Sequence, residues 1–206
     1  MLHYTAMADA AGALRALCDP KREVSAHYLI GRDGTVWHLV DEAKRAWHAG
    51  AGAWGDVRDV NSRSIGIELD NDGYQPFSAP LMTTLERLLP RILQRWAIPA
   101  QRVIAHSDMA PGRKIDPGAR FDWHRLARQE LAVWPETLDQ VDSGAGLFLK
   151  YAQAFGYSAE ADPAQVLAAF RLRFRPGASG PVDPADARLA KALAQRFPVD
   201  RGAPIS

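Results

Sequence analysis

Hydrophobic and polar positions change period several times along the first 133 residues. Four short runs are rich in branched and aromatic residues, as β-strands are: 24–30, 35–40, 64–69 and 102–107. In three other segments apolar residues recur every three or four positions, the spacing of amphipathic helices: 7–18, 78–98 and 121–133. Strands that alternate with helices predict an α/β fold in which helices flank a mixed β-sheet.

Local signals refine this prediction. Gly and Asp at 31–34 separate the first two strand-like runs and predict a β-hairpin. Ser78 is a suitable N-cap for the long helix, whereas Pro90 should kink or split it. The glycine-rich segment 47–64 is predicted to be a long loop, and loops of this length inside a domain are usually functional.

The pattern changes after residue 133. Residues 134–145 are polar and broken, which is typical of a linker. Beyond them we predict three short amphipathic helices, two of which open with Asp-Pro, an N-cap and a first-turn proline: 146–157, 162–174 and 183–197. The chain is therefore divided into an α/β domain (1–133), a linker (134–145) and a small three-helix domain (146–206).

Composition excludes several classes of function. Apolar residues make up 47% of the 206 positions, charged residues 24%, and the formal net charge is +1. No dense Lys/Arg block indicates a nucleic-acid partner, and no apolar run is long enough to span a membrane. Cys18 is the only cysteine, which excludes an intrachain disulfide and a thiolate metal cluster, and we expect it to be a buried helix residue.

Two of the six histidines occupy positions suited to a metal site. His3 and His106 stand at predicted strand ends that open into loops, and Asp116 follows in a loop broken by glycine and proline. Two His and one Asp with an open fourth position are a donor set of catalytic zinc sites. For any single histidine, the alternative is a hydrogen-bonded polar residue that binds no ligand.

Glu68 and Lys114 are the candidate catalytic side chains. Glu68 lies in a run that is predicted to be a buried strand, where an unpaired carboxylate is costly. It can act as a general base whose pKa is set by burial and nearby charge, or it can pair with an Arg or Lys. Lys114 can direct its ammonium at a developing oxyanion, or it can be a solvated loop lysine.

Five segments, in chain order, resemble the zinc-dependent N-acetylmuramoyl-L-alanine amidases of the type 2 family: LHYTA, SAHYLIGRDGTV, AWHAG, NSRSIGIE and HSDMAPGRKIDPG. The likeness runs through nearly all of residues 2–126 and is greatest to bacterial cell-wall amidases with an added C-terminal module. It implies a mixed sheet with helices on its faces. It also implies one Zn²⁺ per chain, bound by His3, His106 and Asp116.

The resemblance further implies an activity. The bond cleaved is the amide between N-acetylmuramic acid, or its anhydro form, and L-alanine of the peptidoglycan stem peptide, in cell-wall turnover or recycling. Glu68 takes a proton from the attacking water and passes it to the departing amine, and Lys114 stabilises the oxyanion. The expected partner is peptidoglycan or a muropeptide.

The glycine-rich loop supplies the predicted substrate-binding residues: Trp47, His48, Trp54 and Asn61. We expect them to form the rim of the site, with the aromatic rings against sugar or stem peptide. The alternative for each is packing within the loop. His27 and His38 are expected to form hydrogen bonds across the hairpin.

Residues 146–206 are similar to a three-helix peptidoglycan-binding module, with two departures. Phe170-Arg171 stands where that module usually has Phe-Gln, and a Gly-Ala-Ser-Gly stretch replaces its usual Asp-Gly turn. The hypothesis is therefore that this domain binds glycan. The alternative is a helical module that only braces the catalytic domain.

Other classes of protein stay open. One is a non-catalytic peptidoglycan-recognition module of the same fold, although such modules lack the zinc ligands; another is a zinc peptidase that cuts within the stem peptide. The resemblance favours the cell envelope or periplasm, whereas the chain as given has no export signal, which favours the cytoplasm. The resembling amidases have a full strand before the residue equivalent to His3, so we expect an N-terminally extended form to bind zinc more tightly.

Overall fold

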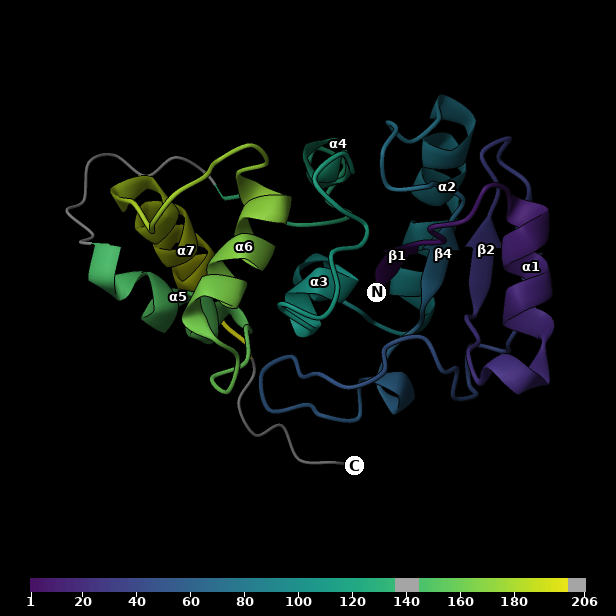
Figure 1. Ribbon diagram of the computed structural model, residues 1–206, viewed down its shortest axis with the longest axis horizontal. Helices are drawn as coiled ribbons and strands as arrows, with labels where there is room; N and C mark the ends of the chain where they lie inside the picture. Colours follow the sequence, from purple (N-terminus) through teal and green to yellow (C-terminus); the bar gives the residue numbers. More distant parts are fainter. Residues whose placement is uncertain (136–144, 200–206) are drawn as a thin grey trace.

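A four-stranded mixed sheet lies at the centre of the part of the chain that the structure describes, residues 1–135 and 145–199. Figure 1 shows this computed structural model. The strands stand in the order β1 (Leu2–Tyr4), β4 (Ile67–Leu69), β2 (Tyr28–Ile30) and β3 (Val36–His38). β4 is parallel to β1 and to β2, whereas β3 is antiparallel to β2. The predicted hairpin is therefore confirmed.

Alternation along the strands assigns each residue to one face of the sheet. On one face the strands supply mainly apolar side chains that pack with helix α2 (Ala79–Arg95) in a single buried cluster; its strand members are Leu2, Tyr28, Ile30, Ile67 and Leu69. The middle residues of the same strands point to the opposite face. There Glu68 is the register partner of both His3 and Leu29. Strand pairing alone thus places a histidine beside a glutamate.

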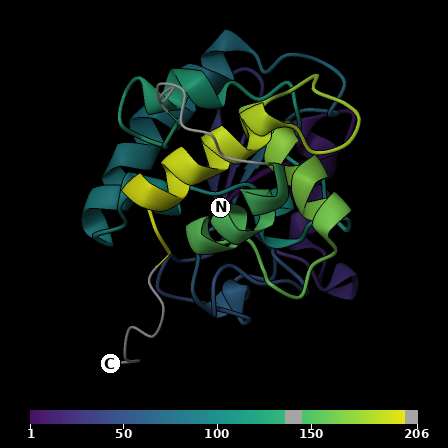
Figure 2. The ribbon, with the colours of Figure 1, turned by 90° about the vertical axis from the view of Figure 1, so that its left-hand side faces the viewer.

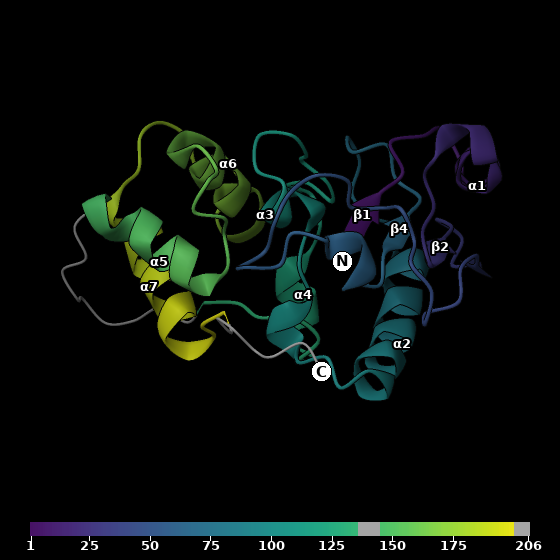
Figure 3. The same cartoon turned by 90° about the horizontal axis from the view of Figure 1, so that it is seen from below.

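Helices cover both faces of the sheet. In Figure 3, α1 (Ala10–Cys18) and α2 lie on opposite sides of the strands. Ser78 caps α2 as predicted, since its side chain accepts a hydrogen bond from the backbone N–H of Leu81. The helix continues through Pro90, so the predicted split is wrong. Pro90 is exposed, and its ring therefore needs no space in the core.

The run 102–107 is not a regular strand. It begins at the end of a 3₁₀ turn, and only Ala105 pairs with the sheet, through a parallel bridge to Leu2. The chain then enters the short helix α3 (His106–Met109). The reason is local: the carboxylate of Asp108 accepts the backbone N–H of Ala105 at 2.9 Å and closes the first helical turn.

Two other predictions are corrected. The segment 121–133 contains only α4 (Trp123–Ala127), and Glu130 adopts a φ of 58°, which a helix cannot accommodate. Cys18 is exposed at the end of α1, because this helix buries Ala13 and Ala16 instead. The 3₁₀ turns of the described residues are η1 (Pro20–Arg22), η2 (Val60–Ser62), η3 (Ala100–Arg102) and η4 (Ala145–Leu147).

The three predicted C-terminal helices are present: α5 (Phe148–Phe155), α6 (Pro163–Phe174) and α7 (Pro184–Arg196). Asp162 and Asp183 cap α6 and α7, each followed by proline in the first turn, as the Asp-Pro pairs predict. In Figure 2 these helices lie in front of the rest of the chain and form a separate layer.

This helical layer packs directly on the α/β part. α6 lies beside α3 in Figures 1 and 3, and Trp54 packs against Phe155 and Tyr157, with ring centroids 5.4 Å apart in each case. One buried apolar cluster contains residues of both parts. Most of the predicted linker, residues 136–144, lies outside the described residues. The division into domains at 133 and 146 stays a proposal.

Within residues 1–135 and 145–199, the structure has no helix with the length and apolar character of a membrane span.

Candidate active site

Three potential metal ligands from distant parts of the sequence meet in one buried cluster. His3 lies in β1, His106 is the first residue of α3, and Asp116 lies in the following loop. The Nδ1 atoms of His3 and His106 are 2.9 Å apart, and each is 3.0 Å from Oδ2 of Asp116. Among the residues that the structure describes, these three form the group of His, Cys, Asp or Glu that can hold a metal ion.

The outer nitrogen of His106 fixes its tautomer. Nε2 lies 2.8 Å from the backbone oxygen of Ala49, which can only accept, so Nε2 carries the hydrogen and donates it. A guanidinium nitrogen of Arg113 donates to the same oxygen at 2.6 Å. The Nδ1 lone pair of His106 is therefore free and points at the cluster.

A longer hydrogen-bond chain orients His3. Ser64 donates its hydroxyl to the carbonyl of Val60 at 2.6 Å, so its oxygen accepts Nε2–H of His48 at 3.3 Å. Nδ1 of His48 then accepts Nε2–H of His3 at 3.0 Å. Because each donor direction follows from the previous one, Nδ1 of His3 presents a lone pair to the cluster, as a metal ligand must.

The protonation states fit a divalent metal. Burial lowers the pKa of His3 to about 4, so its imidazole is neutral at pH 7. Burial opposes ionisation of Asp116, but the neighbouring imidazole groups of His106 and His3 outweigh it and hold the pKa of Asp116 well below its usual range. Neutral imidazoles and an ionised carboxylate are the forms that bind metal. Tetrahedral zinc with bonds of about 2.0–2.1 Å needs donors about 3.3 Å apart, close to the separations found here.

The two candidate catalytic residues lie at the same cavity. Glu68 is partly exposed to it, yet its Oε2 is inaccessible to solvent and has no hydrogen-bond partner within the described structure. Burial, with a contribution from Asp116, raises the pKa of Glu68 to about 8, and the ammonium of Lys114 opposes that rise. An unpaired carboxyl group beside metal ligands has the environment of a general base.

The cavity has a volume of about 530 Å³. The metal-ligand cluster, Glu68 and Lys114 form one part of its wall, and α1 contributes Ala13, Ala16 and Leu17 to it. Trp47 and Ile115 also line it and are 56% and 61% exposed, respectively. Substrate contact by Trp47 stays a prediction, and its position in the cavity wall supports it.

The other three predicted substrate-binding residues have structural partners instead. His48 is buried against His3, and Asn61 is buried with its Oδ1 accepting the backbone N–H groups of His48 and Ala49 at 3.0 and 2.8 Å. Trp54 is 6% exposed and contacts the helical layer rather than the cavity. Substrate contact by these three residues stays a prediction. His48 also lines the cavity, whereas the contacts found for Asn61 and Trp54 are of the kind that the packing alternative describes.

Two other histidines do not bond to each other across the hairpin as predicted. His27 accepts the backbone N–H of Gly66 and contacts the carbonyl of Lys44, whereas His38 stacks on Tyr28. Sequence reasoning missed Ser64, which orients His48, and Arg113, which donates to the same Ala49 carbonyl as His106. Their only signal was their place inside the two motifs NSRSIGIE and HSDMAPGRKIDPG.

Glu68 makes the stability of the metal-free protein depend on pH. Its pKa in the folded state is about 8 instead of 4.5, so the folded protein retains a proton that the unfolded chain releases. The free energy of unfolding therefore falls as the pH rises from about 4.5 through about 8. Because Gln does not titrate, we expect the free energy of unfolding of Glu68→Gln to fall less over this pH range than that of the original chain, by at least about 1 kcal/mol. This figure is kept low because the side chain is partly exposed.

Denaturant unfolding of both proteins in chelator at pH 5 and pH 8.5 measures this difference. An identical pH dependence in the two proteins would contradict the assignment.

Gly66 gives a second prediction. A Cβ at this position would lie 2.4 Å from the ring of His48, so Gly66→Ala must displace that ring and disturb its bond to His3. We expect the free energy of unfolding to fall by about 1–3 kcal/mol, measured by denaturant titration. Gly146→Ala is the control, since nothing lies within 4 Å of its Cβ position; an equally small effect at both positions would show that the His48 packing is unimportant.

Known proteins share this fold and these motifs. The Amidase_2 family model, described as N-acetylmuramoyl-L-alanine amidase, matches residues 1–119. The chain is 33% identical to N-acetylmuramoyl-L-alanine amidase AmiD of Escherichia coli (strain K12) over 97% of its own length and 83% of that relative. It is 41% identical over 103 residues to the 1,6-anhydro-N-acetylmuramyl-L-alanine amidase AmpD of Haemophilus influenzae, which covers 50% of this chain and 56% of AmpD.

A solved structure extends the likeness to the helical layer. The complex of E. coli AmiD with anhydro-N-acetylmuramic acid-L-Ala-D-gamma-Glu-L-Lys has a TM-score of 0.87 and 32% identity, and it covers 95% of this chain and 88% of that one. The predicted fold class, a mixed sheet flanked by helices, is confirmed. On its sequence and its fold, the chain belongs to the N-acetylmuramoyl-L-alanine amidase family.

Proposed function

We propose that the chain is a zinc enzyme that hydrolyses the amide bond between N-acetylmuramic acid, in its 1,6-anhydro form, and L-alanine of the stem peptide. The observation that carries this proposal is the buried cluster of His3, His106 and Asp116 with Glu68 as the strand neighbour of His3. The anhydro form is favoured because the AmpD relatives are named for it and the AmiD complex contains it.

Zn²⁺ bound by the three ligands would supply a Lewis acid for the amide carbonyl and lower the pKa of a water molecule in the site. Glu68 is placed to accept the proton of the attacking water and then to return it to the departing amine nitrogen of L-alanine. Lys114, whose charge already acts on Glu68, stabilises the negative charge that develops on the substrate oxygen.

The raised pKa of Glu68 suits this role. A base that must gain and then give up a proton works best when its pKa is near the operating pH. A carboxylate of ordinary pKa would be a weaker base and would take the proton from the attacking water less readily. The positive charge of a metal at the cluster would favour the ionised form of Glu68, and so ready it to accept the first proton.

The substrate enters from the open side of the cavity. Trp47, Ile115 and Val24 line this cavity and are exposed, an apolar rim that can contact the sugar ring or the stem peptide. The stem-peptide specificity of the site therefore depends on contacts at this rim rather than on the ligands below it.

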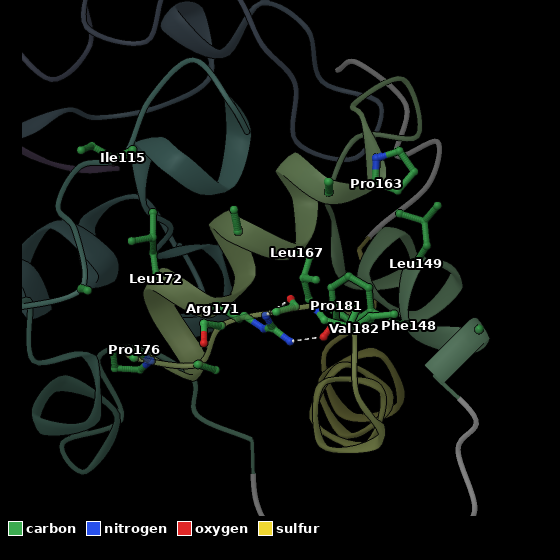
Figure 4. Close-up of a pocket in the computed structure, with 18 residues that line it drawn as sticks. Ile115, Phe148, Leu149, Pro163, Leu167, Arg171, Leu172, Pro176, Pro181 and Val182 are labelled. Carbon is green, nitrogen blue, oxygen red and sulfur yellow. Dashed lines mark hydrogen bonds between the residues drawn. The ribbon is translucent and has the colours of Figure 1, made fainter.

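Glycan binding by the helical part is a separate proposal. Figure 4 shows a cavity of about 770 Å³ between α5, α6 and the loop at 176–182. Its wall is mainly apolar, and the guanidinium of Arg171 within it is already occupied by Asp186 and the carbonyls of Gly180 and Pro181. Ile115 borders this cavity and the catalytic cavity alike, so a strand bound in one can continue into the other.

The compartment follows from the substrate. Peptidoglycan turnover suggests the cell envelope or periplasm, and recycling of soluble anhydro-muropeptides in the cytoplasm is the alternative. A substrate test on intact wall and on soluble fragments separates the two.

We expect the zinc-loaded protein to release an intact stem peptide that begins with L-alanine from a defined anhydro-muramyl-tripeptide, as identified by mass. Chelation should abolish the release and added zinc restore it. Glu68→Gln should lower kcat by about 10²–10⁴-fold while zinc stays bound, because only proton transfer is removed. Lys150→Met, an exposed lysine on α5, is the matched surface control and should leave kcat unchanged.

Cleavage within the stem peptide would instead identify a peptidase. Binding of the muropeptide without any cleavage would identify a recognition module.

A further inference from the structure

The C-terminal helices contact the loop that presents a metal ligand. The contact is Asp108, which lies in α3 two residues after His106 and is fully buried. Its carboxylate accepts the backbone N–H of Ala105 at 2.9 Å, on the other side of His106. A single side chain thus closes the turn that begins with the ligand.

Two of the donors to Asp108 come from the helical layer. The hydroxyl of Tyr157 donates to Oδ1 at 2.7 Å, and Nη1 of Arg173 donates to Oδ2 at 2.6 Å. Both side chains are 1% exposed. Because a buried carboxylate without partners is strongly disfavoured, the position of the Asp108 side chain depends on these two residues, which lie 49 and 65 positions away in sequence.

Arg173 also holds the chain before His106. Its Nη2 donates to the backbone oxygen of Val103 at 3.2 Å, so one guanidinium bonds to the residues three before and two after the ligand. The guanidinium is held in place by the ring of Trp123, with its central carbon 4.1 Å from the ring centroid, and by Phe174 at 4.7 Å.

Arg171, a neighbouring arginine, forms an ion pair that lies entirely within the helical layer. Arg171 lies on the same helix, is 6% exposed, and forms a bidentate pair with the buried Asp186 of α7. Its other hydrogen bonds go to the carbonyls of Gly180 and Pro181, which also belong to the helical layer. Arg173 is also buried and also pairs with a buried aspartate, but its hydrogen bonds are made to the α/β part.

We propose that Arg173 and Tyr157 are positioning residues of the metal site: through Asp108 they hold the turn that aims His106 at the metal. The inference rests on the proposed zinc function. It gives the helical layer a part in metal binding that is independent of any glycan it binds. Groups that hydrogen-bond directly to a metal ligand typically change metal affinity by about 10–100-fold when they are lost. Arg173 and Tyr157 act through Asp108 and the Ala105 backbone, so we expect effects at or below the lower end of that range.

The test is the zinc dissociation constant of the full chain, measured by competition with a chromophoric chelator. We expect Arg173→Met to raise this constant by about 10-fold, the lower end of the range for groups that bond directly to a metal ligand. We expect Tyr157→Phe to raise it by about 3-fold, because Arg173 still donates to Asp108 in that variant. Arg171→Met removes an equally buried ion pair from the same helix and should leave the zinc dissociation constant within about 2-fold of the original chain.

Circular dichroism and thermal unfolding of the metal-free variants show whether each one is folded. Should Arg173→Met not fold, Tyr157→Phe carries the test, because it removes only one hydroxyl and keeps the ring.

Two outcomes would overturn the inference. One is an equal loss of zinc affinity in Arg171→Met and Arg173→Met, which would show that general loosening of the helices is the cause. The other is unchanged zinc affinity in folded Arg173→Met and Tyr157→Phe. If the original chain itself bound no zinc, the proposed function would fail instead, so the two failures are distinguishable.

Discussion

The convergence of His3, His106 and Asp116 on one buried point is the constraint on which the rest of the structure depends. Three polar atoms lie 2.9–3.0 Å apart away from solvent, an arrangement that is costly unless each group is held by other bonds or by a cation. The imidazoles must be neutral and turned with Nδ1 inward, and the carboxylate must be ionised. The hydrogen bonds of His48 and of the Ala49 carbonyl orient the rings of His3 and His106, respectively.

The sheet register sets the position of His3. β1 and β4 pair so that His3 stands beside Glu68, while the alternate residues of both strands form the apolar core with α2. The glycine in SIGIEL leaves room for the ring of His48, which in turn orients His3. The segment SIGIEL therefore contributes three things to the site: Glu68 as the candidate base, Ser64 as the partner of His48, and Gly66, which leaves room for the His48 ring.

The sequence predicted much of this, and its failures have physical reasons. His3, His106, Asp116, Glu68 and Lys114 were named from strand ends and motifs, and the structure brings them to one cavity. Periodicity also predicted the hairpin, the long helix and the three C-terminal helices. The predicted enzyme class agrees with the family to which the chain belongs.

Residues whose environment depends on distant partners were not predictable. Trp54 looked like a loop aromatic free to contact substrate, but its partners Phe155 and Tyr157 lie about a hundred positions away. The run 102–107 has strand composition, yet a helix begins at its residue 106, closed by Asp108, whose other partners Tyr157 and Arg173 are distant in sequence. Cys18 was expected to be buried in a helix whose alanines turn out to face inward. Local pattern carries no information about such contacts.

The central claim is that this cluster binds a catalytic zinc ion, and X-ray absorption at the zinc edge of the zinc-loaded protein tests it most directly. The account predicts one zinc per chain with two imidazole nitrogens and oxygen donors at about 2.0–2.2 Å, and loss of that signature in Asp116→Ala. Zinc bound through a different set of donors, or an unchanged signature in Asp116→Ala, would contradict it.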